Sequence, residues 1–164
     1  MTDEAGLLEI EKDRKTKTAV ICPVIKTAAG MMTAEEEAAR ENEAAGLVLA
    51  MGQEIVFCET VRMSAIVPKS FFGKGTLERL RTACEEKGAE LLVVDMPVSA
   101  VQQRNLEKML NMKVIDRTAV ILEIFGQRAQ TREGKLQVEL AHLTYQRGRL
   151  VRSWTHLERQ RGGG

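Results

Sequence analysis

Aromatic residues and long apolar stretches are both scarce in this chain of 164 residues. Aromatics make up 4% of the sequence, so we expect a core built mainly from aliphatic side chains. No run of about 18 apolar residues occurs, which argues against a membrane-spanning helix. The first residues are polar and mixed in charge, unlike a secretory signal peptide. Together with the cysteine pattern described next, which fits a reducing cytoplasm, these absences predict a cytoplasmic protein.

Cysteine and histidine are also too few and too scattered to build a metal centre. Cys22, Cys58 and Cys84 are odd in number and widely spaced, so we expect neither a disulfide framework nor a zinc site. His142 and His156 lie too far apart in sequence to suggest a metal pair. All three cysteines fall among predicted core positions. We therefore predict no catalytic residue and no metal ligand.

What the sequence does contain is an alternation of strand and helix patterns. Residues 18–25, 91–94 and 113–116 are apolar runs typical of buried parallel strands. One or two further strands are expected within 47–61, and a loop over 62–72. The alternation predicts an α/β fold, with a small, mostly parallel sheet of about four strands flanked by helices.

Capping signals mark the starts of two of these helices. Thr33 and Glu36 have the spacing of a capping box, and Gly46 is expected to end the helix that they open. Ser99 and Gln102 have the same spacing ahead of a second helix.

Residues 118–150 read as helix throughout, with a bend expected at Gly126 and a weak point at Gly134. Leucines at steps of four, three and seven form a narrow seam suited to packing along one neighbouring helix. The seam comprises Leu136, Leu140, Leu143 and Leu150. No partner helix follows in the sequence, which ends 14 residues later in glycines. We interpret this end as a break inside a glycine-rich connection.

Positive charge is concentrated in the last part of the chain. Residues 127–164 hold eight basic and three acidic residues, whereas residues 1–126 hold 16 and 20. Such asymmetry suggests a polyanionic partner, although a solvated helix face would also account for it. Arginine binds phosphates and an indole ring can stack on an exposed base, so RNA would suit this segment. The alternative is that Trp154 is buried against a neighbouring helix.

One glycine-rich turn and two strand-end carboxylates suggest a different site. Gly73, Lys74 and Gly75 precede a helix whose N-terminus could hold a phosphate, although the spacing is not that of a P-loop. Asp95 and Asp116 follow predicted strands, where open α/β folds bind ligands. A tight turn that starts a helix, and caps at strand ends, are the competing interpretations. A regulatory nucleotide-binding domain, with this turn and Asp95 as its site, is therefore an alternative function.

Several segments resemble a known family. They are Gln-Gln-Arg-Asn-Leu at 102–106, Val-Ile-Asp-Arg-Thr at 114–118, Gln-Arg-Ala at 127–129, Thr-Arg-Glu-Gly-Lys-Leu-Gln-Val-Glu-Leu at 131–140 and Trp-Thr-His-Leu-Glu-Arg-Gln at 154–160. They resemble the N-terminal region of the HflX family of ribosome-associated GTPases. The resemblance is strong from about Phe72 onward and weak before Val67. The family's glycine turn usually reads Gly-x-Gly-Lys, so Gly-Lys-Gly-Thr at 73–76 departs from it.

The resemblance implies a domain plan and a cofactor. It implies a polar lead at 1–17, an α/β subdomain at 18–117, a helical subdomain at 118–150 and a basic loop at 151–164. The long C-terminal helix would then be half of an antiparallel coiled coil. GTP and Mg²⁺ would bind a G domain absent from this sequence, so the chain alone is not expected to hydrolyse GTP.

The resemblance also implies a partner, namely the large ribosomal subunit and its RNA during ribosome splitting or rescue. The residues expected to contact RNA are Arg147, Arg149, Arg152, Trp154, His156, Arg159 and Arg161. The other partners would be the missing second helix and G domain. A structural dimerisation module, in which the leucine seam pairs two copies, is a further alternative.

Overall fold

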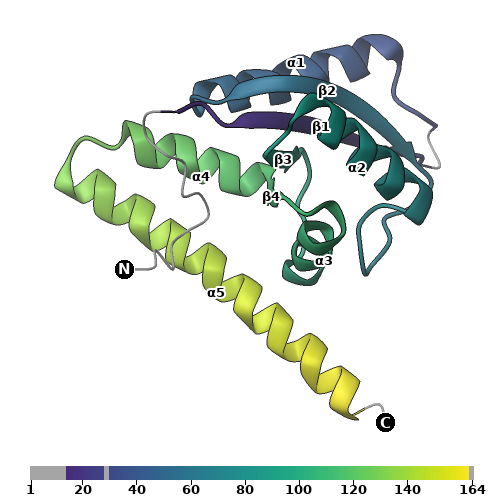
Figure 1. The fold of residues 1–164 in the computed structure, drawn as a ribbon. Helices are drawn as coiled ribbons and strands as arrows, with labels where there is room; N and C mark the ends of the chain where they lie inside the picture. The colour runs from purple at the N-terminus through teal and green to yellow at the C-terminus, as the bar shows by residue number, and fades with distance from the viewer. Residues whose placement is uncertain (1–13, 28–29, 163–164) are drawn as a thin grey trace.

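A computed structural model describes the backbone of residues 14–27 and 30–162, with side chains described as far as residue 147. Four parallel strands form one sheet in the order β2-β1-β3-β4 (Figure 1). The strands are β1 (Lys17–Ile25), β2 (Glu54–Met63), β3 (Leu91–Val94) and β4 (Lys113–Asp116). The expected fold class, a four-stranded parallel sheet flanked by helices, is confirmed.

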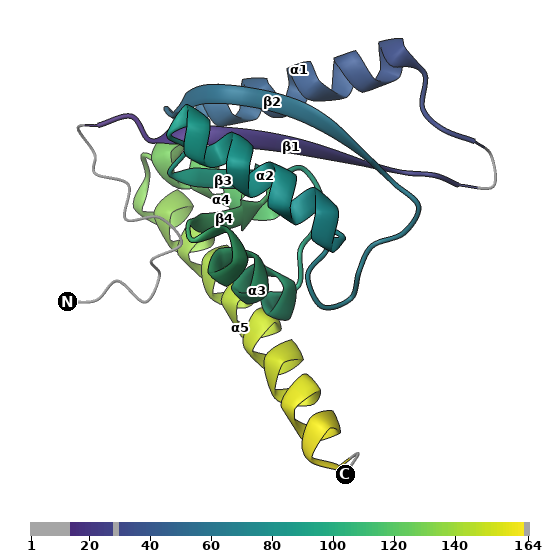
Figure 2. The ribbon, with the colours of Figure 1, turned by 45° about the vertical axis from the view of Figure 1, so that its right-hand side comes forward.

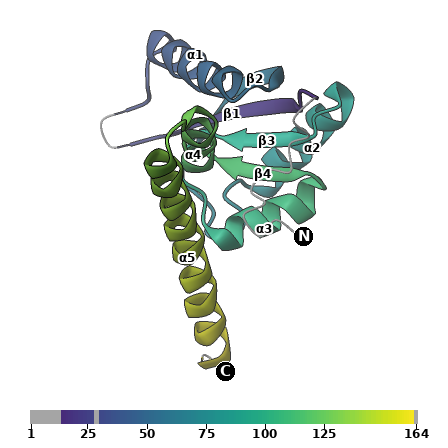
Figure 3. The ribbon, with the colours of Figure 1, turned by 90° about the vertical axis from the view of Figure 1, so that its left-hand side faces the viewer.

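Helices cover both faces of this sheet. The helices α1 (Ala34–Ala50) and α4 (Arg117–Arg128) pack on one face, and α2 (Lys74–Lys87) and α3 (Ala100–Leu110) pack on the other (Figures 2 and 3). The last helix, α5 (Arg132–Gly162), begins beside α4 and runs away from the sheet. Within the described residues, none of the helices is both long and apolar enough to cross a membrane.

Alternation along β1 supplies both halves of the core. Ala19 and Ile21 pack with α2 and α3, whereas Val20 and Cys22 pack with α1 and α4. The chain moves outward from β1 to β2 and then returns across β1 to β3. The winding direction therefore reverses between β1 and β3, and Asp95 follows β3 at this point.

Helix α1 does not end at Gly46, as the sequence suggested, but continues to Ala50. Both Val48 and Met51 are fully buried against the sheet. Burying two such side chains contributes roughly 3 to 6 kcal/mol, more than the cost of about 1 kcal/mol for a glycine within a helix. The chain turns instead at Gly52, whose φ of 90° suits glycine. Only one strand, β2, follows.

The long helix predicted after β4 is two helices, and neither expected glycine breaks it. The break lies at Ala129, which has extended backbone angles. The hydroxyl of Thr131 then accepts a hydrogen bond from Gly134 N at 2.9 Å, as a helix cap does. Gly126 lies inside α4, where an added Cβ would lie 3.5 Å from Val138 Cγ1 of α5. That distance is an ordinary van der Waals contact, so α4 and α5 lie close together here but have room for a small side chain at residue 126.

Candidate functional site

The carboxylate of Asp116 joins three segments at the end of β4. Its Oδ1 accepts hydrogen bonds from Ala119 N at 3.1 Å and from the Tyr145 hydroxyl at 2.9 Å. Its Oδ2 accepts from Val98 N at 3.1 Å. Asp116 is only 3% exposed, so these bonds are shielded from water. One side chain thus caps α4, fixes the loop before α3 and holds α5.

Further polar groups lie where α4 meets α1 and α5. Gln127 Nε2 of α4 donates to Met51 O at the end of α1, at 2.9 Å, and so fixes the far end of α4. Glu123 is half-buried, and burial raises its pKa while nearby His142 and Lys113 lower it. His142 Nδ1 is buried and has no hydrogen-bond partner among the described residues. The direction in which α5 leaves the body is therefore set by packing together with a few polar contacts.

The face of α5 directed away from α4 exposes three leucines of the predicted seam. Leu136, Leu140 and Leu143 are 56%, 65% and 56% exposed. Such exposure is unusual for three leucines spaced along one helix face. Leu150, the fourth predicted member, lies outside the residues whose side chains are described.

A shallow pocket of about 370 Å³ lies between α4 and α5, apart from the exposed leucines. Leu122 and Phe125 of α4, with Val138 and Ala141 of α5, supply its apolar lining. Phe125 is 57% exposed. No sequence signal indicated this pocket, because it depends on the angle between two helices.

Most of the predicted RNA-binding residues follow on the distal part of α5. Arg147 is exposed. The helical backbone continues to Gly162, through the segment that we expected to be a loop. The remaining members, whose side chains lie outside the described part of the chain, are Arg149, Arg152, Trp154, His156, Arg159 and Arg161.

The predicted glycine turn is the start of α2. Gly73 is the N-cap, with extended backbone and no capping side chain, and Lys74 and Gly75 are exposed in the first turn. Phe71 and Phe72 anchor the turn in the core, with their ring centroids 4.9 Å apart in an edge-to-face arrangement. The structure thus shows the helix start that both interpretations of this motif require.

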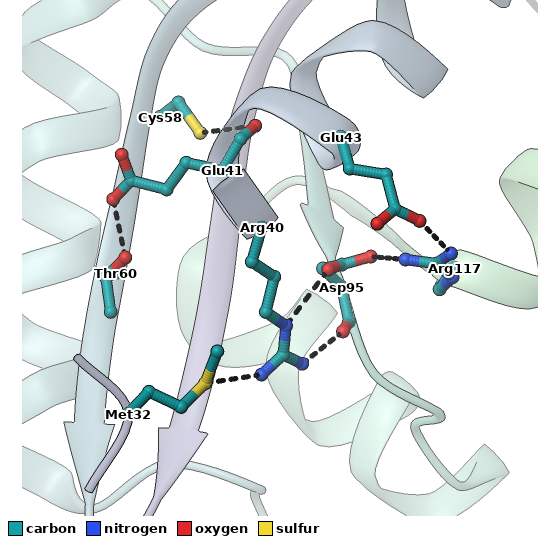
Figure 4. A network of polar contacts seen from close by, with 8 residues as sticks. All are labelled: Met32, Arg40, Glu41, Glu43, Cys58, Thr60, Asp95 and Arg117. Carbon is teal, nitrogen blue, oxygen red and sulfur yellow. Dashed lines mark hydrogen bonds and ion pairs between the residues drawn. The ribbon is translucent and has the colours of Figure 1, made fainter. Parts of the chain in front are cut away.

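Asp95 lies at the centre of an ion-pair cluster that spacing alone did not reveal (Figure 4). Its Oδ2 is 3.4 Å from Arg40 Nε of α1, and its Oδ1 is 3.0 Å from Arg117 Nη1 of α4. Arg40 Nη2 also donates to Asp95 O at 3.1 Å. Arg117 donates in addition to Glu43 of α1, which lowers the pKa of that exposed carboxyl group.

The cluster occupies the point of the sheet where open α/β folds bind ligands. Both carboxylate oxygens of Asp95 are engaged by guanidinium groups, and Asp95 is 3% exposed. The arrangement therefore joins α1 and α4 across the edge of the sheet and does not present an open carboxylate. Sequence reasoning singled out Asp95, but not Arg40 or Arg117, which lie 55 and 22 residues away from it.

The cysteines lie in or beside the core. Cys22 and Cys84 are buried, and Cys58 is half-buried. A hydrogen bond between Cys22 and Cys58, followed by burial, raises the pKa of Cys22, and the same bond lowers the pKa of Cys58. Over the described ranges, no group of three or more His, Cys, Asp or Glu side chains could hold a metal ion.

Solved structures resemble this arrangement of strands and helices. A GTP-binding protein from Sulfolobus solfataricus in complex with GDP superimposes with a TM-score of 0.60 at 21% identity, covering 89% of this chain and 42% of that one. Another structure, of an SsGBP and GDP complex, also gives 0.60 at 22% identity, over 80% of this chain and 35% of that one. At this identity the similarity shows the shared fold.

Sequence comparisons are more specific. Residues 38–126 match the family described as GTP-binding GTPase N-terminal, and residues 128–164 match the GTP-binding GTPase middle region. A GTPase HflX from Magnetococcus marinus is 52% identical over 74% of this chain and 28% of its own length. The GTPase HflX of Escherichia coli K12 is 48% identical over 74% of this chain and 29% of its own. The chain thus spans less than a third of these curated relatives, and it belongs to the HflX family of GTPases, whose N-terminal region it contains.

Proposed function

We propose that this chain is the ribosome-docking region of an HflX-type GTPase. The α/β body would hold α5 in place, and the basic end of α5 would bind ribosomal RNA of the large subunit during splitting or rescue. GTP and Mg²⁺ would bind to the G domain, because this sequence contains no Gly-x-x-x-x-Gly-Lys-Ser or Gly-x-x-x-x-Gly-Lys-Thr motif.

The observation that carries this proposal is the position of α5. The helix is held near its middle through Tyr145 and Asp116, and it then extends away from the sheet (Figure 1). Its outer face exposes Leu136, Leu140 and Leu143. A second helix packed antiparallel along this face would bury them. Fully burying an exposed leucine side chain contributes roughly 1.5 to 3 kcal/mol. We infer that α5 is half of an antiparallel coiled coil in the full-length protein.

Charge supports the RNA contact. Five of the proposed contact residues are arginines, namely Arg147, Arg149, Arg152, Arg159 and Arg161. Each phosphate that a protein neutralises on single-stranded nucleic acid contributes about −0.7 to the slope of log affinity against log salt. Five contacts therefore correspond to a slope of roughly −3.5, and Trp154 would add stacking or wedging between bases.

Co-sedimentation of the full-length protein with large ribosomal subunits across a salt series tests the proposal. Replacing Arg152, Trp154 and Arg159 together by alanine should weaken binding and reduce the salt slope by about 1.4, because two phosphate contacts are lost. Arg81→Ala on the exposed face of α2 is the matched control and should leave binding unchanged. Unaltered binding by the triple variant would refute the assignment.

The regulatory nucleotide-binding alternative is less well supported. This alternative places the nucleotide between the Gly73 turn and the carboxylate of Asp95. Arg40 and Arg117 already engage both oxygens of that carboxylate. Isothermal titration with ATP and GTP distinguishes the two proposals, since binding by this chain would favour the alternative.

A further inference from the structure

The two edge strands of the sheet, β4 and β2, differ in whether side chains cover their outward backbone groups. At the β4 edge, α3 supplies side chains that engage the backbone of Val114. Gln103 Nε2 donates to Val114 O at 2.8 Å, and Glu107 Oε2 accepts from Val114 N at 3.2 Å. These bonds occupy groups that could otherwise pair with another strand. The β4 edge is thus both short and covered.

The β2 edge is long and, among the residues that the structure describes, uncovered. Glu54 N and Met63 O point toward the β1 side, because they bond to Thr16 O and Lys26 N. Backbone groups alternate in direction along a strand, so the register after the bulge directs those of Cys58, Thr60 and Arg62 outward. Throughout the described ranges, no hydrogen bond reaches these outward groups. An uncovered edge of this length is a template for a further strand.

Helix α1 presents an apolar strip beside the same edge. Its residues Glu37, Ala44 and Val48 are buried against the sheet. Arg40 and Glu43 lie on the side of α1 nearer β3 and α4, where they bond to Asp95 and Arg117. At 100° per residue, the outer side therefore carries Ala34, Ala38, Glu41, Ala45 and Leu49.

Leu49 is 59% exposed, and Ala34 and Ala38 are also exposed, so this side of α1 has little cover. In Figures 1 and 3, α1 and β2 lie at one end of the molecule with no other element beyond them. The open strand edge and the apolar strip thus form one continuous surface.

We propose that this surface pairs with a second copy of the chain about a two-fold axis. The two β2 strands would run antiparallel, with Thr60 opposite its own counterpart and Cys58 opposite Arg62. The outward N–H and C=O groups of Cys58, Thr60 and Arg62 would then form hydrogen bonds with those of the second copy. Two four-stranded sheets would join into one sheet of eight strands.

The positions on α1 are self-complementary about the same axis. In an antiparallel pair of α1 helices centred between Glu41 and Asn42, Ala38 lies opposite Ala45 and Ala34 lies opposite Leu49. Small residues let the two helices approach closely over the joined strands. The helix centre and the strand centre coincide, because Glu41 Oε1 accepts a hydrogen bond from the Thr60 hydroxyl. Two independent elements therefore specify one axis.

Charge is compatible with this pairing. The side chain of Arg62 is 62% exposed although it bonds to Glu37, and it would lie beside Glu41 of the second copy. Glu35, Glu36 and Glu43 lie on other sides of α1, away from the axis. Glu41 is the acidic residue of α1 that faces the second copy, and Arg62 of that copy would offset its charge.

Sedimentation equilibrium of the chain over a wide concentration range tests the proposal. We expect a dimer of twice 18.2 kDa that dissociates on dilution. Ala38→Arg and, separately, Ala45→Arg should each weaken dimerisation at least about tenfold, since each places a bulky charge in the helix contact. Ala39→Arg is the matched control, because residue 39 is exposed and points away from the sheet. Circular dichroism checks that each variant remains folded.

Hydrogen exchange tests the strand pairing directly. As concentration rises, the amides of Cys58, Thr60 and Arg62 should become protected, whereas that of Glu59, which points to β1, should already be slow. A chain that stays monomeric at every concentration overturns the proposal. So does a dimer that withstands both Ala38→Arg and Ala45→Arg but dissociates with Leu140→Lys, because it would use the leucine seam.

Discussion

Replacing Tyr145 by phenylalanine isolates the bond that holds α5 to the body. The change removes the hydroxyl that donates to Asp116 Oδ1 at 2.9 Å and keeps the ring that packs beside the core. No cavity is created, so the cost should come from the lost hydrogen bond. Since Asp116 is 3% exposed, water can replace the hydroxyl only poorly.

The magnitude follows from the kind of bond. A hydrogen bond to a charged group contributes about 1.5 to 3 kcal/mol to stability. Tyr145 is half-buried, so we take the lower end, about 1.5 kcal/mol. For a chain of this size, that loss corresponds to a fall in Tm of about 3 to 6 °C.

Urea denaturation at neutral pH, followed by circular dichroism, measures the change in the free energy of unfolding. Asp116→Asn should cost more, about 3 kcal/mol, because in either orientation its amide NH₂ must face a backbone N–H donor, that of Val98 or that of Ala119. In the Asp116→Asn background, Tyr145→Phe should cost less than in the parent chain. This reduced cost is the signature of direct coupling.

Two results would refute the reasoning. The first is a Tyr145→Phe variant as stable as the parent. The second is strict additivity with Asp116→Asn, which would mean that the hydroxyl stabilises the protein through some other group.

Three further predictions concern charged groups, two of them around α4 and one, Arg81, on α2. Arg117→Ala should lower the free energy of unfolding by about 2 kcal/mol, because Asp95 keeps only Arg40 and the pair is 35% exposed on the arginine side. Arg81→Ala, in an exposed pair, should cost less than about 0.5 kcal/mol by the same urea assay. Glu123→Gln should raise stability at neutral pH. Burial raises the folded-state pKa of Glu123, so its charge opposes folding above that pKa and has no effect once pH falls below its unfolded value. A Glu123→Gln gain that persists in acid would contradict this sign.

The parts of the fold predicted correctly are those that local chemistry determines. Both capping boxes are present, with Thr33 and Glu36 bonded reciprocally and likewise Ser99 and Gln102. The buried parallel strands were recognisable because they are covered on both faces and so lack polar alternation. The prediction that α1 ends at Gly46 was wrong, because burial of Val48 and Met51 outweighs the preference of glycine for a helix end.

The polar contacts that fix the helices could not be predicted in the same way. Tyr145 and Asp116 are 29 residues apart, and Arg40 and Asp95 are 55 apart. Such pairs form only because parallel strands end at one edge of the sheet, where several helix termini meet. Spacing identified Asp95 and Asp116 as strand-end carboxylates, but their partners depend on the packing angles of α1, α4 and α5.

The contact between Tyr145 and Asp116 has a mechanical consequence. At about 1.5 Å per residue, α5 extends roughly 25 Å beyond Tyr145, so it acts as a lever whose pivot lies near that residue. A tilt of about 5° at that pivot moves the tip by about 2 Å, which is most of the length of a hydrogen bond. Small changes in how α5 packs around Tyr145 and Asp116 are therefore amplified at its far end.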